Sequence, residues 1–151
     1  MIASALRIFV LGDTHNKLPK QLRAPAEAVD EIWHLGDVCS PSILDEIGTW
    51  GAPVRVVLGN CDENLEWPAV LHLTRNTVRF QLVHIPPTRP PVGVDVVLHG
   101  HTHVPRNEMV GGVRFLNPGC VTRPNRGAPP SVALLEVDEQ GAIEWRLLPV
   151  R

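Results

Sequence analysis

Cysteine is scarce in this chain and is not arranged for cross-linking. The three cysteines, Cys39, Cys61 and Cys120, form no C-x-x-C pair, and their number is odd. We therefore expect neither a disulfide framework nor a structural zinc site built on cysteine pairs. A chain of 151 residues is long enough to bury a stable core without either. Free thiols fit a reducing compartment.

Long apolar runs and clusters of basic residues are also missing. No segment approaches the roughly 20 apolar residues that cross a bilayer, and Arg7 interrupts the apolar run near the start. We therefore expect a soluble, cytoplasmic protein without a leader segment or membrane contact. The formal net charge is -2 and Lys and Arg form no run, so we expect no strong nucleic-acid-binding surface. A nuclease site is still compatible with this charge, because metal ions hold a phosphate without a basic surface.

The first half of the chain alternates strand-like and helix-like segments. Each strand-like run is mostly apolar and closes on a glycine, as strands buried on both faces do. The expected strands are 6–12, 31–36 and 53–59, and the expected helices are 19–30 and 40–48. This βαβαβ order is typical of a parallel sheet covered by helices.

The second half consists mostly of strand-like segments. Residues 76–84 and 94–100 are expected strands, 85–93 with four prolines is an expected loop, and 106–117 and 131–148 are expected hairpins. No repeat or low-complexity segment appears in the chain. We therefore expect a single mixed α/β (α+β) domain over residues 1–151.

Side chains that bind metals follow the glycines at the ends of these strands. The blocks read Gly-Asp-Thr-His, Gly-Asp, Gly-Asn-Cys-Asp and Gly-His-Thr-His, and a fifth strand ends directly in a histidine. Because ligands collect at the carboxyl ends of strands in open α/β sheets, we expect these side chains to converge. The seven candidate metal ligands are Asp13, His15, Asp37, Asn60, His84, His101 and His103.

The chemistry of this set points to a catalytic centre. Carboxylates, imidazoles and an amide are typical ligands of catalytic Mn²⁺, Fe, Zn²⁺ or Ni²⁺. The set has no thiolate, so it does not fit a cysteine-rich structural zinc site. A single catalytic ion takes about three or four protein ligands, so seven candidates predict two ions about 3.5–4 Å apart. Such a pair activates a shared water and clamps a phosphoryl group.

The order of the blocks resembles the calcineurin-like metallophosphoesterase superfamily, and most of all its small bacterial and archaeal phosphodiesterase branch. The family pattern is D-x-H, G-D, G-N-C-D or G-N-H-E, a lone His, and G-H-x-H, and all five blocks occur in this order over residues 12–103. "NPGC" at 117–120 is similar to the N-P-G-S of that branch. The resemblance implies a four-layer β-sandwich flanked by α-helices, with the site on loops at one end of the sheets.

The resemblance also implies how the ligands divide between two ions. One ion would be held by Asp13, His15 and His103, the other by Asn60, His84 and His101, and Asp37 would bridge them. Asp37, Asn60 and His101 would also be catalytic. The expected metal is Mn²⁺, with Fe, Ni²⁺, Co²⁺ or Zn²⁺ as alternatives. The implied reaction is hydrolysis of a phosphodiester, nucleotide-derived substrates included, by a hydroxide that bridges the two ions.

The chain departs from the family pattern close to the expected site. His84 stands in "LVHIPPTRPP" where the family has T-H-G-H, so the proline-rich loop is expected to reshape the mouth of the site. Cys61 occupies the position at which larger phosphatases of the superfamily carry a histidine that is proposed to protonate the leaving group. A thiol is a poor substitute, so we expect activated aryl esters to be favoured. Cys61, Asp62 and Arg123 are candidate substrate contacts, with Arg126 in the same loop as Arg123.

Other interpretations stay open. A phosphomonoesterase would use the same metal clamp. The retromer's phosphoesterase-like subunit keeps this fold for partner binding with an altered metal site, so a scaffold is a second alternative, and a structural-metal domain is a third. Taken singly, Asp13 and Asp37 also fit turn residues, and His99 is expected to be structural. Exposed apolar strands in the second half leave pairing of two copies open.

Overall fold

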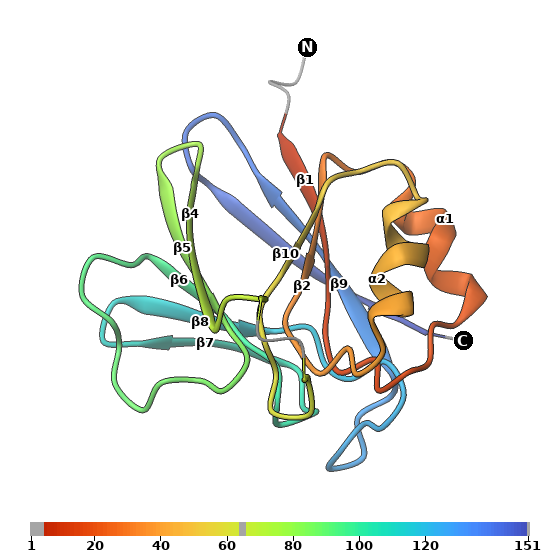
Figure 1. The fold of residues 1–151 in the computed structure, drawn as a ribbon. Helices are drawn as coiled ribbons and strands as arrows, with labels where there is room; N and C mark the ends of the chain where they lie inside the picture. Colours follow the sequence, from red (N-terminus) through yellow and green to blue (C-terminus); the bar gives the residue numbers. More distant parts are fainter. Residues whose placement is uncertain (1–4, 64–65, 151) are drawn as a thin grey trace.

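Two five-stranded sheets pack face to face in the computed structural model, which describes residues 5–63 and 66–150 (Figure 1). The strand order is β10-β9-β1-β2-β3 in the first sheet and β4-β5-β6-β8-β7 in the second. The strands are β1 (Leu6–Leu11), β2 (Glu31–His34), β3 (Val54–Val56), β4 (Val70–Arg75), β5 (Val78–Val83), β6 (Val96–Leu98), β7 (Arg106–Val110), β8 (Val113–Asn117), β9 (Ser131–Val137) and β10 (Ile143–Pro149). The expected two-sheet sandwich is confirmed.

Three strands of each sheet are joined by parallel pairing. In the first sheet β1 pairs with β2 and β2 with β3, and in the second sheet β5 pairs with β6 and β6 with β8, all in parallel. The remaining pairs are antiparallel and join β1 with β9, β9 with β10, β4 with β5, and β7 with β8. Because the carboxyl ends of parallel strands meet at one edge, the loops that follow these strands gather at the lower end of the molecule in Figure 1.

The main core lies between the two sheets. Alternate residues of β1 point to opposite faces, so Ile8 and Val10 face the second sheet while Phe9 and Leu11 face the helices. Trp33 of β2 is fully buried and meets the ring of Phe80 from β5 edge-on, with the ring centroids 5.3 Å apart. This contact joins the two halves of the chain.

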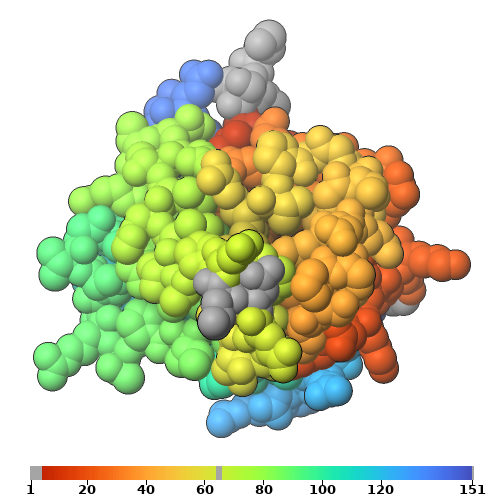
Figure 2. Space-filling model, viewed as in Figure 1, coloured from red at the N-terminus to blue at the C-terminus, as the bar shows by residue number. Residues whose placement is uncertain are grey.

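Helices cover the outer face of the first sheet. In the space-filling view they form the orange side of the molecule, beside the green side formed by β4 and β5 (Figure 2). The helix expected over 40–48 is confirmed as α2 (Pro41–Gly48). The expectation of one helix over 19–30 was wrong: the segment forms only η1 (Lys20–Leu22) and α1 (Arg23–Ala26). It stops there because Asp30 exchanges backbone and side-chain hydrogen bonds with Arg7 at the start of β1.

The outer face of the second sheet has a small apolar cluster of its own. Val94, Val97, Val113 and Phe115 pack there, and Pro90 of the proline-rich loop approaches the turn at Gly111. Among residues 5–63 and 66–150, all helical segments precede β3, so the fourth, helical layer that the resemblance implies is not formed on this face. A loop and a small apolar cluster take its place.

The expected strands and hairpins of the second half are confirmed with one addition. Hairpins β7–β8 and β9–β10 fall where they were expected. The strand expected over 76–84 begins later, because Asn76 and Thr77 take positive φ angles of 47° and 70° and form a tight turn. The turn pairs β5 with β4, a strand that the sequence reasoning missed.

In the described part of the chain, no helix has the length and apolar character that crossing a bilayer requires. The expectation about a leader segment rests largely on residues 1–4, which lie outside the described residues.

We expect Trp33→Ala to lower the free energy of unfolding by about 3–5 kcal/mol, because it empties a large volume between the sheets. Urea denaturation followed by circular dichroism measures this loss. Val92→Ala, at a fully exposed position, is the control and should change stability by less than about 0.5 kcal/mol. A loss below about 1 kcal/mol for Trp33→Ala would contradict its place in the core.

Candidate metal centre

The structure brings all seven predicted metal ligands together at the carboxyl ends of the parallel strands. Each ligand block follows a different strand, and the strands come from both sheets. The ligands are Asp13 after β1, with His15 two residues on, Asp37 after β2, Asn60 after β3, His84 after β5, and His101 and His103 after β6. The centre therefore lies across the junction of the two sheets.

Four of these side chains form one group. Asp13 Oδ1 lies 3.4 Å from His103 Nε2 and 3.9 Å from His15 Nε2. The two Nε2 atoms are themselves 3.4 Å apart. One ligand atom from each of Asp13, His15, Asp37 and His103 falls within 4.8 Å of the others. That is a compact set of two carboxylates and two imidazoles around one point.

Asn60, His84 and His101 form a second group beside the first. Asn60 Oδ1 lies 2.9 Å from His84 Nε2 and 3.2 Å from His101 Nδ1. The rings of His84 and His101 meet edge-on with centroids 5.2 Å apart. The amide oxygen and both ring nitrogens therefore face a common volume.

Asp37 stands between the two groups. Its Oδ2 lies 3.6 Å from His15 Nε2 in the first group and 3.2 Å from His84 Nε2 in the second. Asp13 Oδ1 also comes within 3.8 Å of His84 Nε2. The two groups are thus contiguous and share carboxylate oxygens.

Backbone carbonyls fix the orientation of two imidazoles. His84 Nδ1 lies 2.8 Å from the carbonyl oxygen of Leu35, and His103 Nδ1 lies 2.6 Å from that of Arg123. Because a carbonyl only accepts, each Nδ1 carries a proton, and each Nε2 is turned toward the carboxylates. Histidine ligands of protein metal sites are held in this way.

The two carboxylates are buried and differ in their surroundings. Burial raises the pKa of Asp13 to about 6, against the opposing charges of His84 and His103. Burial would also raise the pKa of Asp37, but hydrogen bonds from the His84 ring and from the Cys61 backbone N–H hold this pKa well below its usual range. Asp13 Oδ1 finds no hydrogen-bond donor within the described residues. A buried carboxylate oxygen that has no hydrogen-bond partner and faces imidazole nitrogens fits a divalent cation.

The family model for the calcineurin-like phosphoesterase superfamily domain matches residues 6–140. The chain belongs to this superfamily. A probable metallophosphoesterase of Methanothermobacter thermautotrophicus is 34% identical over 149 residues, which span 87% of this chain and 86% of the relative.

Solved structures of the superfamily share the fold. Vps29 of Entamoeba histolytica (D62A mutant) is 23% identical with a TM-score of 0.77, over 97% of this chain and 100% of that one. A novel archaeal phosphodiesterase is 20% identical with a TM-score of 0.70, over 95% of this chain and 100% of that one. Likeness at this level of identity shows the metallophosphoesterase fold.

Left-handed backbone conformations concentrate at the centre. Five of the seven ligands have positive φ: Asp13 at 55°, His15 at 45°, Asp37 at 58°, His101 at 73° and His103 at 61°. Asp and His are enriched among the side chains that tolerate this region, although each such residue still costs about 1–3 kcal/mol. The cost is borne because adjacent strand ends bond to one another, as in Asp13 N–H to the Gly36 carbonyl at 2.9 Å.

Asp62, a candidate substrate contact, is engaged by the backbone instead. Its carboxylate accepts hydrogen bonds from the N–H groups of Gly59 at 2.8 Å, Asp37 at 2.9 Å and Cys39 at 2.7 Å. A Cβ on Gly59 would lie 2.1 Å from the Asp37 nitrogen, so the two loops touch directly. Both oxygens of Asp62 therefore serve to hold the Asp37 loop against the Gly59 turn.

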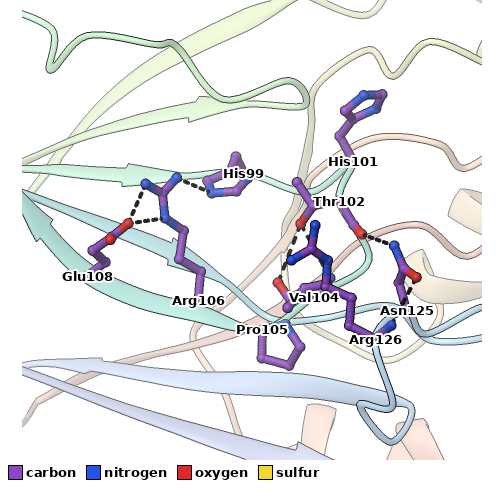
Figure 3. Close-up of a pocket in the computed structure, with 9 residues that line it drawn as sticks. All are labelled: His99, His101, Thr102, Val104, Pro105, Arg106, Glu108, Asn125 and Arg126. Atoms are coloured by element: carbon purple, nitrogen blue, oxygen red, sulfur yellow. Dashed lines mark hydrogen bonds and ion pairs between the residues drawn. The ribbon is translucent and has the colours of Figure 1, made fainter.

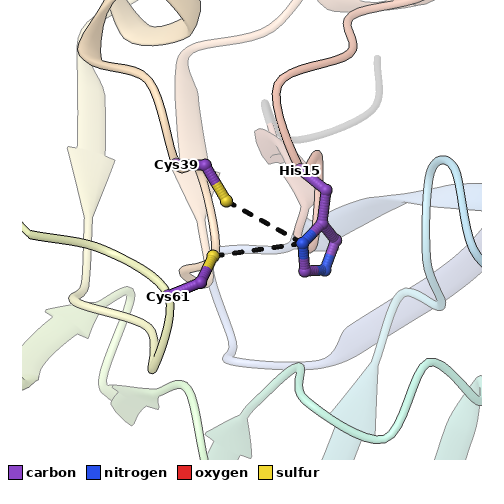
Figure 4. A group of neighbouring side chains, drawn as sticks. All are labelled: His15, Cys39 and Cys61. Atoms are coloured by element: carbon purple, nitrogen blue, oxygen red, sulfur yellow. Dashed lines mark hydrogen bonds between the residues drawn. The ribbon is translucent and has the colours of Figure 1, made fainter.

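Two thiols lie behind His15 (Figure 4). Its Nδ1 is 3.8 Å from Cys39 Sγ and 3.9 Å from Cys61 Sγ. Burial, the neighbouring Cys39 thiol and the Asp37 carboxylate raise the pKa of Cys61, so this thiol stays protonated at neutral pH. The sequence reasoning did not place Cys39 at the site, although its position two residues after Asp37 could have suggested it.

The remaining predicted residues lie around the centre. The Arg123 side chain is exposed at the rim. The pKa of His15 is lowered mainly by burial, and the nearby charges of His103 and Arg123 lower it further. His99 is buried and donates from Nδ1 to the Gly100 carbonyl, which fits the structural role expected for it. A pocket of about 560 Å³ adjoins His101 and is lined in part by Arg106, which the sequence did not single out.

His34 lies fully buried near the centre without facing it. Its Nδ1 accepts from the Gly36 N–H at 3.1 Å, so its Nε2 carries the proton and donates to Thr14 Oγ1 at 3.1 Å. Burial lowers the pKa of His34 to about 3. At pH values between about 3 and the ordinary histidine pKa of 6.5, His34 is therefore protonated in the unfolded chain but neutral in the folded protein.

We therefore expect His34 to make the folded protein less stable as the pH falls. Relative to His34→Gln, the free energy of unfolding of the metal-free wild type should drop by up to about 1.4 kcal/mol per pH unit from about pH 6.5 downward. Urea denaturation in chelator between about pH 7 and about pH 5 measures this difference. His72→Gln, at an exposed strand position, is the matched control. Parallel curves for wild type and His34→Gln would contradict the neutral assignment.

Proposed function

We propose that this single-domain protein is a phosphodiesterase that works with two divalent metal ions. The observation that carries the proposal is the position of Asp37, whose Oδ2 lies within 3.6 Å of His15 Nε2 and 3.2 Å of His84 Nε2. A carboxylate shared by two ligand groups is what paired ions about 3.5–4 Å apart require. The fold shared with an archaeal phosphodiesterase supports a diester as the substrate.

The proposed assignment follows the two ligand groups. Asp13, His15 and His103 would hold one ion, Asn60, His84 and His101 would hold the other, and Asp37 would contact both. The mixture of carboxylate, imidazole and amide oxygen suits Mn²⁺, while Fe, Ni²⁺, Co²⁺ and Zn²⁺ also accept such ligands. Cytoplasmic Mn²⁺ loading and a nucleotide-derived substrate are part of the same proposal.

The residues of the chain orient the reaction. When bound, the two ions supply a polarised water as the nucleophile and positive charge for the phosphoryl oxygens. The Leu35 carbonyl keeps Nε2 of His84 turned inward, and the Arg123 carbonyl does the same for His103. Asn60 and His101 are the exposed members of the second ligand group, so they would also approach the phosphate. Asp62 holds the Asp37 loop rather than the substrate.

We expect chelator-stripped protein to hydrolyse bis-p-nitrophenyl phosphate only after Mn²⁺ is added, and faster than p-nitrophenyl phosphate. Asp37→Asn should lower kcat/KM by at least about 100-fold, because losing a shared ligand weakens the binding of both ions. Even mutation of residues that only hydrogen-bond to metal ligands typically lowers metal affinity or activity by about 10–100-fold. Asp45→Asn, on the exposed side of α2, is the matched control.

Each alternative gives a different result in this assay. Faster turnover of the monoester would identify a phosphomonoesterase. Folded protein that binds Mn²⁺ but hydrolyses neither ester would favour a partner-binding scaffold. Full activity of Asp37→Asn would overturn the shared-ligand assignment.

Leaving-group chemistry provides a second test. The Cys61 thiol is held protonated with a raised pKa and the Asp62 oxygens are engaged by the backbone, so neither is suited to protonate a leaving group. We expect kcat to fall steeply as the leaving group of a diester series becomes more basic. Cys61→His should restore about 10-fold or more for alkyl diesters, whereas Cys61→Ser should not. Equal wild-type rates for alkyl and nitrophenyl diesters would contradict this account.

A further inference from the structure

The pocket of about 560 Å³ opens directly beside the metal centre (Figure 3). His101 belongs to both, since its Nδ1 faces Asn60 Oδ1 and its side chain lines the pocket. The other walls come from the start of β7 and from the loop between β8 and β9, which projects from the lower edge of the molecule in Figure 1. A group esterified to a phosphate at the centre can therefore extend past His101 into this pocket.

One wall of the pocket is rigid. Arg106 donates from Nη1 to His99 Nε2 at 3.2 Å and from Nε to Glu108 Oε1 at 2.8 Å. Its guanidinium carbon lies 4.5 Å from the centroid of the Phe115 ring. Because His99 Nδ1 donates to the Gly100 carbonyl, its Nε2 accepts this bond. The charge of Arg106 is matched by Glu108.

Arg126 lines the pocket on the side opposite Arg106, and no acidic side chain pairs with its charge in the described residues. Its backbone N–H is held by Asn125 Oδ1 at 2.9 Å, and its φ of 52° is uncommon for an arginine. Figure 3 shows its guanidinium turned toward Val104 and Thr102. Within the described ranges 5–63 and 66–150, no hydrogen bond or ion pair engages that guanidinium.

The neutral polar groups of the pocket are already used. Thr102 Oγ1 accepts from Asn117 Nδ2 at 3.0 Å and lies 3.3 Å from the Val104 N–H. Asn125 donates from Nδ2 to the Thr102 carbonyl and accepts at Oδ1 from the Arg126 N–H. A guanidinium has five N–H donors, so most of the hydrogen-bond donors that remain available in the pocket belong to the two arginines.

From this arrangement we propose that the pocket is a subsite for a second anionic group of the substrate, a phosphate carried by one arm of the diester, with Arg126 as the residue that determines this specificity. The inference rests on the proposed phosphodiesterase function. Arginine binds phosphate through two parallel hydrogen bonds. In a chain of net charge -2, a local unpaired cation is required to favour a more highly charged substrate over a neutral-armed one.

A matched substrate pair tests the subsite. Thymidine 5′-(p-nitrophenyl phosphate) and its 3′-phosphorylated form differ by one phosphate on the nucleoside arm. With the Mn²⁺-loaded protein, we expect kcat/KM to be about 10-fold or more higher for the 3′-phosphorylated form. Arg126→Gln should abolish that preference, and Arg126→Lys should keep part of it. Arg89→Gln, at an exposed position of the proline-rich loop, is the matched control and should retain the full preference.

Product binding gives a readout without turnover. In calorimetry, thymidine 3′,5′-bisphosphate should bind the wild type about 10-fold more tightly than thymidine 5′-monophosphate, and Arg126→Gln should remove the difference. Equal affinities in the wild type, or an equal loss for both ligands in Arg126→Gln, would overturn the subsite. Failure to hydrolyse bis-p-nitrophenyl phosphate would instead overturn the phosphodiesterase proposal, while calorimetry still reports on Arg126.

Discussion

The rest of the structure depends on the need to compensate two buried carboxylates, Asp13 and Asp37. Removing two like charges from water is costly unless each is paired and hydrogen-bonded. Backbone N–H groups of Cys61 and His101 cover one oxygen of each, and imidazoles surround the others. The glycine-ended strands, the left-handed loop residues and the Asp62 anchor all act to keep these oxygens at the end of the sandwich. Asp13 Oδ1 is left without a hydrogen-bond partner in the described residues, and a divalent cation bound there would complete the compensation.

Much of the fold and of the centre could be predicted because the informative residues lie in the strands themselves. Apolar runs closed by glycine identified β1, β2 and β3, and the position of each ligand after its strand predicted their convergence. The helix over 19–30 failed because a tertiary contact, Asp30 with Arg7, outweighs local helix preference. Strand β4 escaped notice because its half-buried pattern is that of an edge strand and its turn is Asn-Thr rather than the stronger Asn-Gly signal.

The site details that could not be predicted depend on contacts between loops. A carboxylate in Gly-Asn-Cys-Asp suggests chemistry, yet Asp62 is turned inward by three N–H groups from two different loops. Cys39 lies two residues after Asp37, but its contact with His15 exists only because the two loops approach each other. The sequence reasoning did not single out Arg106, and it named Arg126 only because it shares a loop with Arg123. The difference between them, one matched by Glu108 and one unmatched, exists only after β7 and the loop beyond β8 are brought together.

The origin of the centre at the junction of two sheets also constrains how the protein forms. His15 and His103, whose ring nitrogens nearly touch, are 88 residues apart in the chain, and closing so long a loop costs entropy before its contacts repay it. Neither sheet alone holds either ligand group in full, and the carbonyl that orients His103 belongs to Arg123. During synthesis, the nascent chain therefore has no binding-competent centre until most of the domain has left the ribosome and the sheets have docked.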